Sequence, residues 1–196
     1  VVGGGGRGQE EGVRPQEIHH GTAAASLAGP QTDLVFDAIE DQHRTAMRIA
    51  AGALLEHALL IGDLPFGTYE LSDDQALTTA RQFAAAGCDA VKMEGGGAIA
   101  SRVRALGAAG IRVVGHLGLT TQGLKAGEKA RVEAKSSDAA LELLADAKAL
   151  EAAGCVAMIF EAVPAAGSDH LGPQIGIPVI GIGAGAALDG QVLVTA

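Results

Sequence analysis

The sequence contains no tryptophan, and aromatic residues make up only 3% of its 196 positions. This scarcity removes the stacking surfaces on which bases and sugar rings are commonly bound. No apolar run approaches the roughly 18 residues that a membrane-spanning helix needs. The first residues also lack a basic segment leading into an apolar stretch, so no signal peptide is predicted.

Basic residues are few as well, with 14 Lys and Arg against 23 Asp and Glu, and none form a block. A net charge of −9 argues against a nucleic-acid surface. The two cysteines, Cys88 and Cys155, each begin an apolar run, which favours small buried side chains in a reducing compartment over a disulfide or a metal pair. With 48% hydrophobic residues, the composition predicts a globular cytoplasmic protein without membrane or nucleic-acid partners.

Four short apolar runs each end on an ionisable side chain, and each is followed by a helix-like stretch. They span residues 57–63, 88–94, 111–116 and 155–161, and they end on Asp63, Glu94, His116 and Glu161. Apolar runs without alternation are typical of strands buried on both faces, as in parallel sheets. Strands alternating with helices indicate right-handed βαβ units, and the pattern leaves open whether the sheet is a barrel or an open sheet.

The chain divides into two parts on this pattern. Residues 1–31 contain a glycine run and neither a strand nor an amphipathic period, so we predict that they are irregular. Residues 32–196 form the α/β domain. Within it, Val35, Ile39 and Ala46 lie among charged residues and predict a helix over 33–51.

The four ionisable strand ends are the candidate site, because catalytic groups of parallel α/β proteins gather at the C-terminal ends of strands. Three carboxylates and an imidazole around one mouth are typical of metal-assisted chemistry on a small anion. Lys92 faces the same side of its strand as Glu94, because side chains alternate along a strand. An unpaired buried charge is costly, and we favour a substrate-binding lysine over a purely structural Lys–Glu pair.

Each candidate has a structural alternative. Asp63 could cap the following helix, His116 could bind a backbone carbonyl in the core, and Glu161 could pair with a lysine. The glycines of 181–185 invite a dinucleotide-binding interpretation, but that motif must open a full βαβ unit with an acidic residue about 20 positions later. A loop that makes room for an anion or for closely packed neighbouring loops fits better.

Six motifs, in order and at matching spacing, resemble the ketopantoate hydroxymethyltransferase (3-methyl-2-oxobutanoate hydroxymethyltransferase) family. They are GDLPFGTY, VKMEGG, GHLGLTTQ, FEAVP, PVIGIGAG and DGQVLV. The resemblance implies a (β/α)8 TIM barrel of the phosphoenolpyruvate/pyruvate superfamily, homo-oligomeric and cytoplasmic. It also implies transfer of a hydroxymethyl group from 5,10-methylenetetrahydrofolate to 3-methyl-2-oxobutanoate, a step in pantothenate and coenzyme A synthesis.

The same resemblance assigns roles. Asp63 and Glu94 match Mg²⁺-binding positions, and Asp63 also contacts the 2-oxo acid. Lys92 and His116 match positions at the substrate, the role of the histidine remaining open, and Glu161 matches the proton acceptor. A 2-oxo acid can complete the oxygen shell of Mg²⁺, and polarisation of its ketone acidifies the C3–H bond.

The first part of the chain departs from the family. The family has two earlier strands, the second ending in a GDS motif that supplies another metal-binding aspartate, and here His20, Gly21 and Thr22 hold that place. We therefore expect an incomplete barrel with an open edge, one ligand short and impaired in activity, arising from a fragment or a frame error. Two alternatives are another Mg²⁺-dependent 2-oxo acid lyase or aldolase of the superfamily, and an inactive barrel fragment that acts as a binding subunit.

Overall fold

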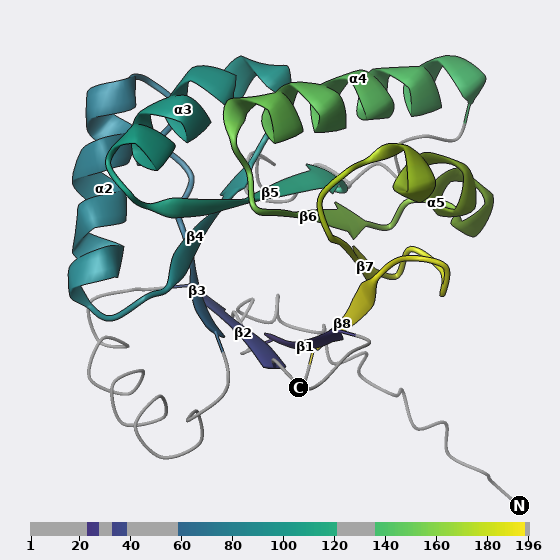
Figure 1. The fold of residues 1–196 in the computed structure, drawn as a ribbon, viewed down its shortest axis with the longest axis horizontal. Helices are drawn as coiled ribbons and strands as arrows, with labels where there is room; N and C mark the ends of the chain where they lie inside the picture. Colours follow the sequence, from purple (N-terminus) through teal and green to yellow (C-terminus); the bar gives the residue numbers. More distant parts are fainter. Residues whose placement is uncertain (1–22, 28–32, 39–58, 121–135, 195–196) are drawn as a thin grey trace, which may run out of the picture.

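The computed structural model describes residues 23–27, 33–38, 59–120 and 136–194, the first two ranges as backbone only (Figure 1). Within these ranges, eight strands close into a barrel in chain order. The strands are β1 (Ala23–Leu27), β2 (Asp33–Ala38), β3 (Leu59–Asp63), β4 (Ala90–Glu94), β5 (Arg112–Gly118), β6 (Ala157–Glu161), β7 (Val179–Ile182) and β8 (Gly190–Val194). The helices are α2 (Asp73–Ala85), α3 (Ala100–Ala108), α4 (Ser137–Ala153) and α5 (Ala165–Leu171), with short 3₁₀ turns η1 (Gly97–Ile99) and η2 (Gly172–Gln174).

The strand pairing confirms an α/β barrel and shows how it departs from a regular (β/α)8 barrel. Each strand from β2 to β7 runs parallel to the next one along the chain, whereas β1 is antiparallel to both β2 and β8. The described helices lie outside β3 to β7 (Figure 1). The expected open edge is wrong, because β1 pairs on both sides and closes the ring.

Two local predictions near the start of the chain are also wrong. The supposedly irregular residues 1–31 contain β1, and the helix expected over 33–51 is a strand at Asp33–Ala38. The apolar run Leu34–Phe36 includes β-branched and aromatic residues, which suit a strand, while the alanines of β1 carry little intrinsic strand signal. The rest of both predictions falls on residues 1–22, 28–31 and 39–51, which lie outside the described residues.

Local capping explains where two of the helices begin and end. The side chain of Ser72 accepts a hydrogen bond from the Gln75 N–H at the start of α2, and two aspartates occupy its first turn. Ser136 caps α4 in the same way through the Ala139 N–H. This helix ends at Gly154, whose φ of 106° is a left-handed conformation that glycine adopts readily.

Two apolar layers pack against the barrel wall, one on its outer face and one on its inner face. The outer layer packs the helices against the strands and includes Phe83, Met93, Leu106, Leu150 and Phe160. The inner layer fills the barrel with inward-facing side chains of successive strands: Ile61, Ala90, Val114, Ile159, Ile180 and Val192. Because side chains alternate along a strand, the next inward-facing positions toward the C-terminal ends form the mouth of the barrel.

Candidate active site

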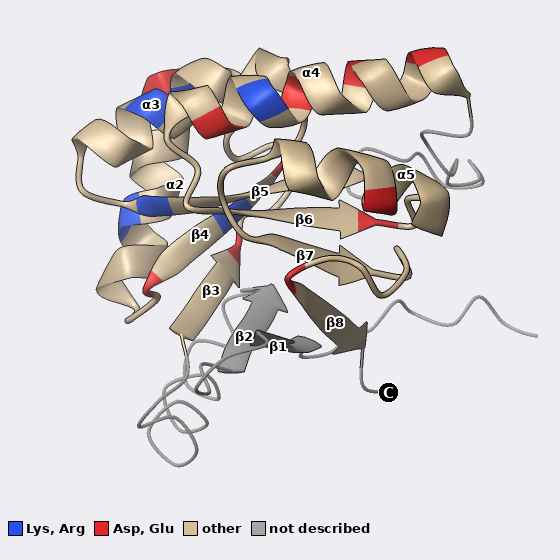
Figure 2. Ribbon diagram, turned by 45° about the vertical axis from the view of Figure 1, so that its right-hand side comes forward, with Lys and Arg blue, Asp and Glu red and all other residues tan. Residues whose placement is uncertain are grey.

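The C-terminal mouth of the barrel collects every side chain that the sequence marked as functional. From the inner apolar layer, inward-facing positions lead to Asp63 on β3, Lys92 and Glu94 on β4, His116 on β5 and Glu161 on β6. The strand register sets Asp63 beside Lys92 and Glu94 beside His116. Acidic residues accordingly mark the arrowheads of β3 and β6 in Figure 2.

These five side chains form one connected polar cluster. The Lys92 Nζ lies 2.7 Å from Asp63 Oδ2 and 3.5 Å from His116 Nδ1. The same His116 Nδ1 lies 3.2 Å from Glu94 Oε1, and its Nε2 lies 3.0 Å from Glu161 Oε2. The contact between His116 Nε2 and Glu161 Oε2 is an ion pair when the imidazole is protonated. The predicted residues therefore meet, while the chemical roles assigned to them stay predictions.

Among the described residues, the contacts of three of these side chains differ from those of the structural alternatives. Helix α2 is capped by Ser72 and not by Asp63. His116 contacts two carboxylates, and the described partner of Glu161 is that histidine.

Burial shapes the electrostatics of the cluster. Lys92, Glu94 and His116 are only 9%, 7% and 2% exposed. Burial raises the pKa of Asp63, and the neighbouring Lys92 ammonium partly offsets this. For His116, burial lowers the pKa, but the carboxylates of Glu161 and Glu94 outweigh it, and the net pKa is raised.

Among the described residues of the mouth, acidic side chains outnumber basic ones. Three carboxylates face one lysine and one histidine. Buried charge of one sign is costly. An added cation is therefore chemically compatible with this part of the mouth.

The donor set fits Mg²⁺ in kind but is sparse. Asp63 and Glu94 offer the hard oxygen ligands that this ion prefers, and it commonly keeps several waters. Among the residues that the structure describes, no three His, Cys, Asp or Glu side chains converge as a ready metal-ligand set. The position that the family fills with the GDS aspartate, here Gly21, lies outside the described residues.

Two backbone features distinguish the chain around Glu161. Glycine is required at Gly118, because φ is +93° and an added Cβ would collide with the Glu161 carbonyl oxygen. The next residue, Leu119, donates its N–H to that oxygen at 2.9 Å. Directly after Glu161, Ala162 has a φ of 51°, a left-handed conformation that costs a non-glycine residue about 1 kcal/mol or more. Strain of this kind is common next to functional residues.

Sequence reasoning missed two residues that support Glu94. The hydroxyl of Tyr69, at the end of the GDLPFGTY motif, contacts the Glu94 backbone. Asp146, on α4, accepts a hydrogen bond from the Gly97 N–H at 2.7 Å. The motif containing the chain's only tyrosine was a usable signal for Tyr69, whereas nothing local marked Asp146 among the acidic residues of its helix.

The Asp146 contact gives a first prediction. A Cβ on Gly96 would overlap the Asp146 carboxylate, so Gly96→Ala should expel that carboxylate from the Gly97 N–H and destabilise the fold by about 1–3 kcal/mol. Gly107→Ala is the matched control, since Gly107 is exposed in α3 with open space around it. It should stabilise the helix by about 0.5–1 kcal/mol. Chemical denaturation measures both, and equal stability of the two variants would contradict the proposed clash.

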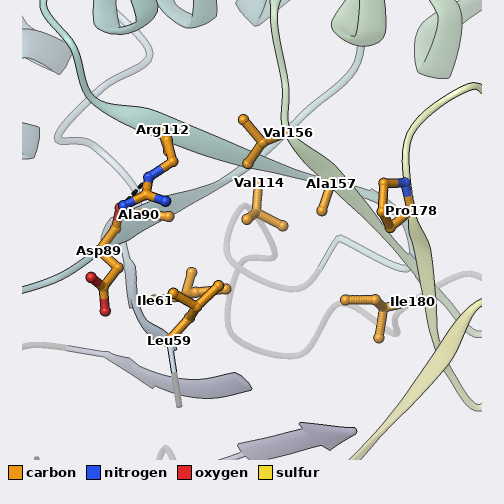
Figure 3. Close-up of a pocket in the computed structure, with 10 residues that line it drawn as sticks. All are labelled: Leu59, Ile61, Asp89, Ala90, Arg112, Val114, Val156, Ala157, Pro178 and Ile180. Carbon is orange, nitrogen blue, oxygen red and sulfur yellow. Dashed lines mark hydrogen bonds between the residues drawn. The ribbon is translucent and has the colours of Figure 1, made fainter. Parts of the chain in front are cut away.

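A cavity of about 230 Å³ lies at the other end of the barrel (Figure 3). It is lined by residues at or near the starts of five strands: Leu59, Ile61, Asp89, Ala90, Arg112, Val114, Val156, Ala157, Pro178 and Ile180. Its polar groups serve structure, since Arg112 Nε donates to the Asp89 carbonyl at 3.1 Å and the Asp89 carboxylate accepts from the Leu60 N–H at 2.9 Å. We therefore place the candidate active site at the charged mouth.

A barrel whose strands β2 to β8 run parallel, with ionisable side chains gathered at their C-terminal ends, defines a (β/α)-barrel protein of the kind whose sites lie in the βα loops. The sequence profile of ketopantoate hydroxymethyltransferase matches residues 23–196, so this chain belongs to that family. The resemblance in the six motifs is thereby confirmed. The match also begins inside the segment that was expected to be atypical.

Similar proteins agree with this assignment. The chain is 44% identical over 175 residues to a 3-methyl-2-oxobutanoate hydroxymethyltransferase of Oleidesulfovibrio alaskensis, covering 89% of this chain and 60% of that protein. It is 46% identical over 137 residues to the Ignicoccus hospitalis protein of the same name, covering 70% and 52%. The chain thus spans about half the length of the curated relatives it matches.

A solved structure supports the fold alone. The carboxyl transferase domain of Rhizobium etli pyruvate carboxylase aligns with a TM-score of 0.53 at 16% identity, covering 76% of this chain and 28% of that one. Within the described part of the chain, none of the helices combines the length and apolar character needed to cross a bilayer.

Proposed function

We propose that the protein transfers a hydroxymethyl group from 5,10-methylenetetrahydrofolate to 3-methyl-2-oxobutanoate, giving 2-dehydropantoate for pantothenate and coenzyme A synthesis. The observation that carries the proposal is the cluster of Asp63, Lys92, Glu94, His116 and Glu161 at one mouth of a barrel that belongs to this family. In the net reaction one water enters, a C–C bond forms at C3 and tetrahydrofolate leaves. We further propose a cytoplasmic homo-oligomer.

Lys92 is suited to bind the carboxylate of the 2-oxo acid. Its ammonium is almost fully buried between Asp63 and His116. The low local dielectric there strengthens the attraction of the ammonium for a second anion. Asp63 fixes the direction of this ammonium through their 2.7 Å contact. The pair can therefore orient the substrate so that its C3 atom faces β6.

Asp63 and Glu94 would hold Mg²⁺, in keeping with the excess of acidic over basic side chains among the described residues of the mouth. When bound, this ion supplies Lewis-acid polarisation of the substrate ketone, which makes the C3 proton more acidic. The need for Mg²⁺ and for the folate donor are both part of the proposal.

Glu161 would take the C3 proton as a general base. Its carboxylate lies beside His116 Nε2, whose other ring nitrogen is held by Glu94, so the imidazole orients the base from behind. The C3–H electrons then form the new C–C bond, and the proton stays on the Glu161 carboxylate until it is released to water. This assigns His116 an orienting role beside the substrate.

A single assay series tests the proposal. We expect the chain to exchange the C3 proton of 3-methyl-2-oxobutanoate with deuterium in the presence of Mg²⁺, and to form 2-dehydropantoate only when the folate donor is added. We expect the rate to be low, because the GDS aspartate has no counterpart in the sequence. An open barrel edge no longer contributes to this expectation, because the strands form a closed ring. NMR over several hours measures both reactions.

The alternatives give different results in the same series. Exchange together with cleavage or condensation of other 2-oxo acids, independent of folate, would indicate a lyase or aldolase. Binding of Mg²⁺ and the oxo acid without exchange or transfer would indicate an inactive binding subunit, and would contradict the proposed activity.

A further inference from the structure

The hydroxyl of Tyr69 makes hydrogen bonds that have no role in the proposed chemistry. Its side chain is 1% exposed. The hydroxyl accepts a hydrogen bond from the Glu94 N–H and donates one to the Glu94 carbonyl oxygen, each at 3.1 Å. Burial raises the pKa of Tyr69, so the phenol keeps the proton that it donates.

The register of the sheet explains why Glu94 needs such a partner. Strand β3 ends at Asp63, which pairs with Lys92, and the Leu64 N–H makes the last ladder bond to the Lys92 carbonyl at 3.0 Å. On that side of β4, therefore, the backbone ladder stops before it reaches Glu94. The Tyr69 hydroxyl supplies the donor and the acceptor that a longer β3 would have supplied.

The loop that carries Tyr69 is braced against the segment that follows Glu94. The Glu70 carboxylate accepts hydrogen bonds from the Gly67 N–H at 2.8 Å and the Tyr69 N–H at 3.2 Å. Arg102, on α3, donates to the Glu70 carbonyl oxygen at 2.7 Å. Since α3 follows β4 through η1, the brace links the chain after Asp63 to the chain after Glu94.

We propose that Tyr69 is a positioning residue: by taking the place of the missing strand partner, its hydroxyl sets where the Glu94 carboxylate lies relative to Asp63, and so sets the affinity of the mouth for a divalent cation. This inference rests on the proposed function, which assigns both carboxylates to Mg²⁺. Partners that orient metal ligands commonly change metal affinity by about 10–100-fold when removed.

Tyr69→Phe tests the inference, with Thr79→Val as a matched control. The first variant removes only the hydroxyl. The second removes the 2.8 Å hydrogen bond from Thr79 Oγ1 to the Thr68 carbonyl oxygen, which ties α2 to the same loop without touching Glu94. Calorimetric titration of the full chain with Mg²⁺, with 3-methyl-2-oxobutanoate present, measures affinity, and hydrogen exchange of the Glu94 amide reports its local protection.

We expect Tyr69→Phe to weaken Mg²⁺ binding by about tenfold or more and to speed exchange of the Glu94 amide. Thr79→Val should lower the unfolding temperature but leave the Mg²⁺ affinity as in the unmodified chain. Equal Mg²⁺ affinity in Tyr69→Phe and the unmodified chain would overturn the inference, and so would equal weakening in both variants. If the unmodified chain binds no Mg²⁺, that result contradicts the proposed metal site and, with it, the role inferred for Tyr69.

Discussion

Glu161→Gln should slow deuterium exchange at C3 of 3-methyl-2-oxobutanoate by at least about 100-fold, the usual contribution of a positioned general base. The amide keeps the shape of the side chain but cannot accept the proton as a carboxylate does. Asp63 and Glu94 lie on β3 and β4, whereas Glu161 lies on β6, so Mg²⁺ affinity should change little. Exchange is followed by NMR and affinity by calorimetry.

The control for this variant is Glu142→Gln, which makes the same chemical change on the exposed face of α4. It should leave both exchange and Mg²⁺ affinity as they are in the unmodified chain. Exchange that continues at the original rate in Glu161→Gln would show that another group, or a water molecule, takes the C3 proton.

The location of the site was predictable because it depends on a short-range rule. Side chains two apart on a strand face the same way, and parallel strands end at the same rim. The apolar runs ending at Asp63, Glu94, His116 and Glu161 therefore sufficed to place these side chains together. Which side-chain atoms contact one another was not predictable. The position of His116 between the carboxylates of Glu94 and Glu161 follows from the strand register.

The closure of the barrel was not predictable, because it depends on contacts between residues that are far apart in the sequence. Strand β1 is a run of small residues with weak intrinsic preference, and its conformation follows from pairing with β2 and β8, the latter more than 160 positions away. The contacts of Tyr69 and Asp146 with the segment around Glu94 likewise span 25 and 49 positions. Periodicity within a window carries no information on such pairings.

Lys92→Met should destabilise the fold by about 3–5 kcal/mol at neutral pH, the usual result of removing one partner from a buried ion pair. Methionine retains the apolar stem but leaves the carboxylates of Asp63, Glu94 and Glu161 with His116 as the remaining basic side chain among the described residues of the mouth. Such a loss is large against the roughly 5–15 kcal/mol that stabilise a domain. Chemical denaturation measures it.

The pH dependence of this loss has a definite sign. Burial already raises the pKa of Asp63 above its usual 3.8, so protonation of this group favours the folded state, and that contribution is lost as the pH rises through the folded-state pKa. Lys92 lowers the same pKa, and its removal moves the pKa further upward. The difference in stability between Lys92→Met and the unmodified chain should therefore narrow as the pH is lowered from 7.

Lys148→Met is the matched control, because Lys148 pairs with Glu151 at 2.9 Å on the surface of α4. An exposed pair at this spacing contributes about 0.5 kcal/mol or less, so this variant should be nearly as stable as the unmodified chain. Added Mg²⁺ should stabilise Lys92→Met more than the unmodified chain, since the ion then supplies the positive charge that the lysine gave. Equal stability of the two methionine variants would mean that Lys92 and Asp63 do not form a buried ion pair in solution.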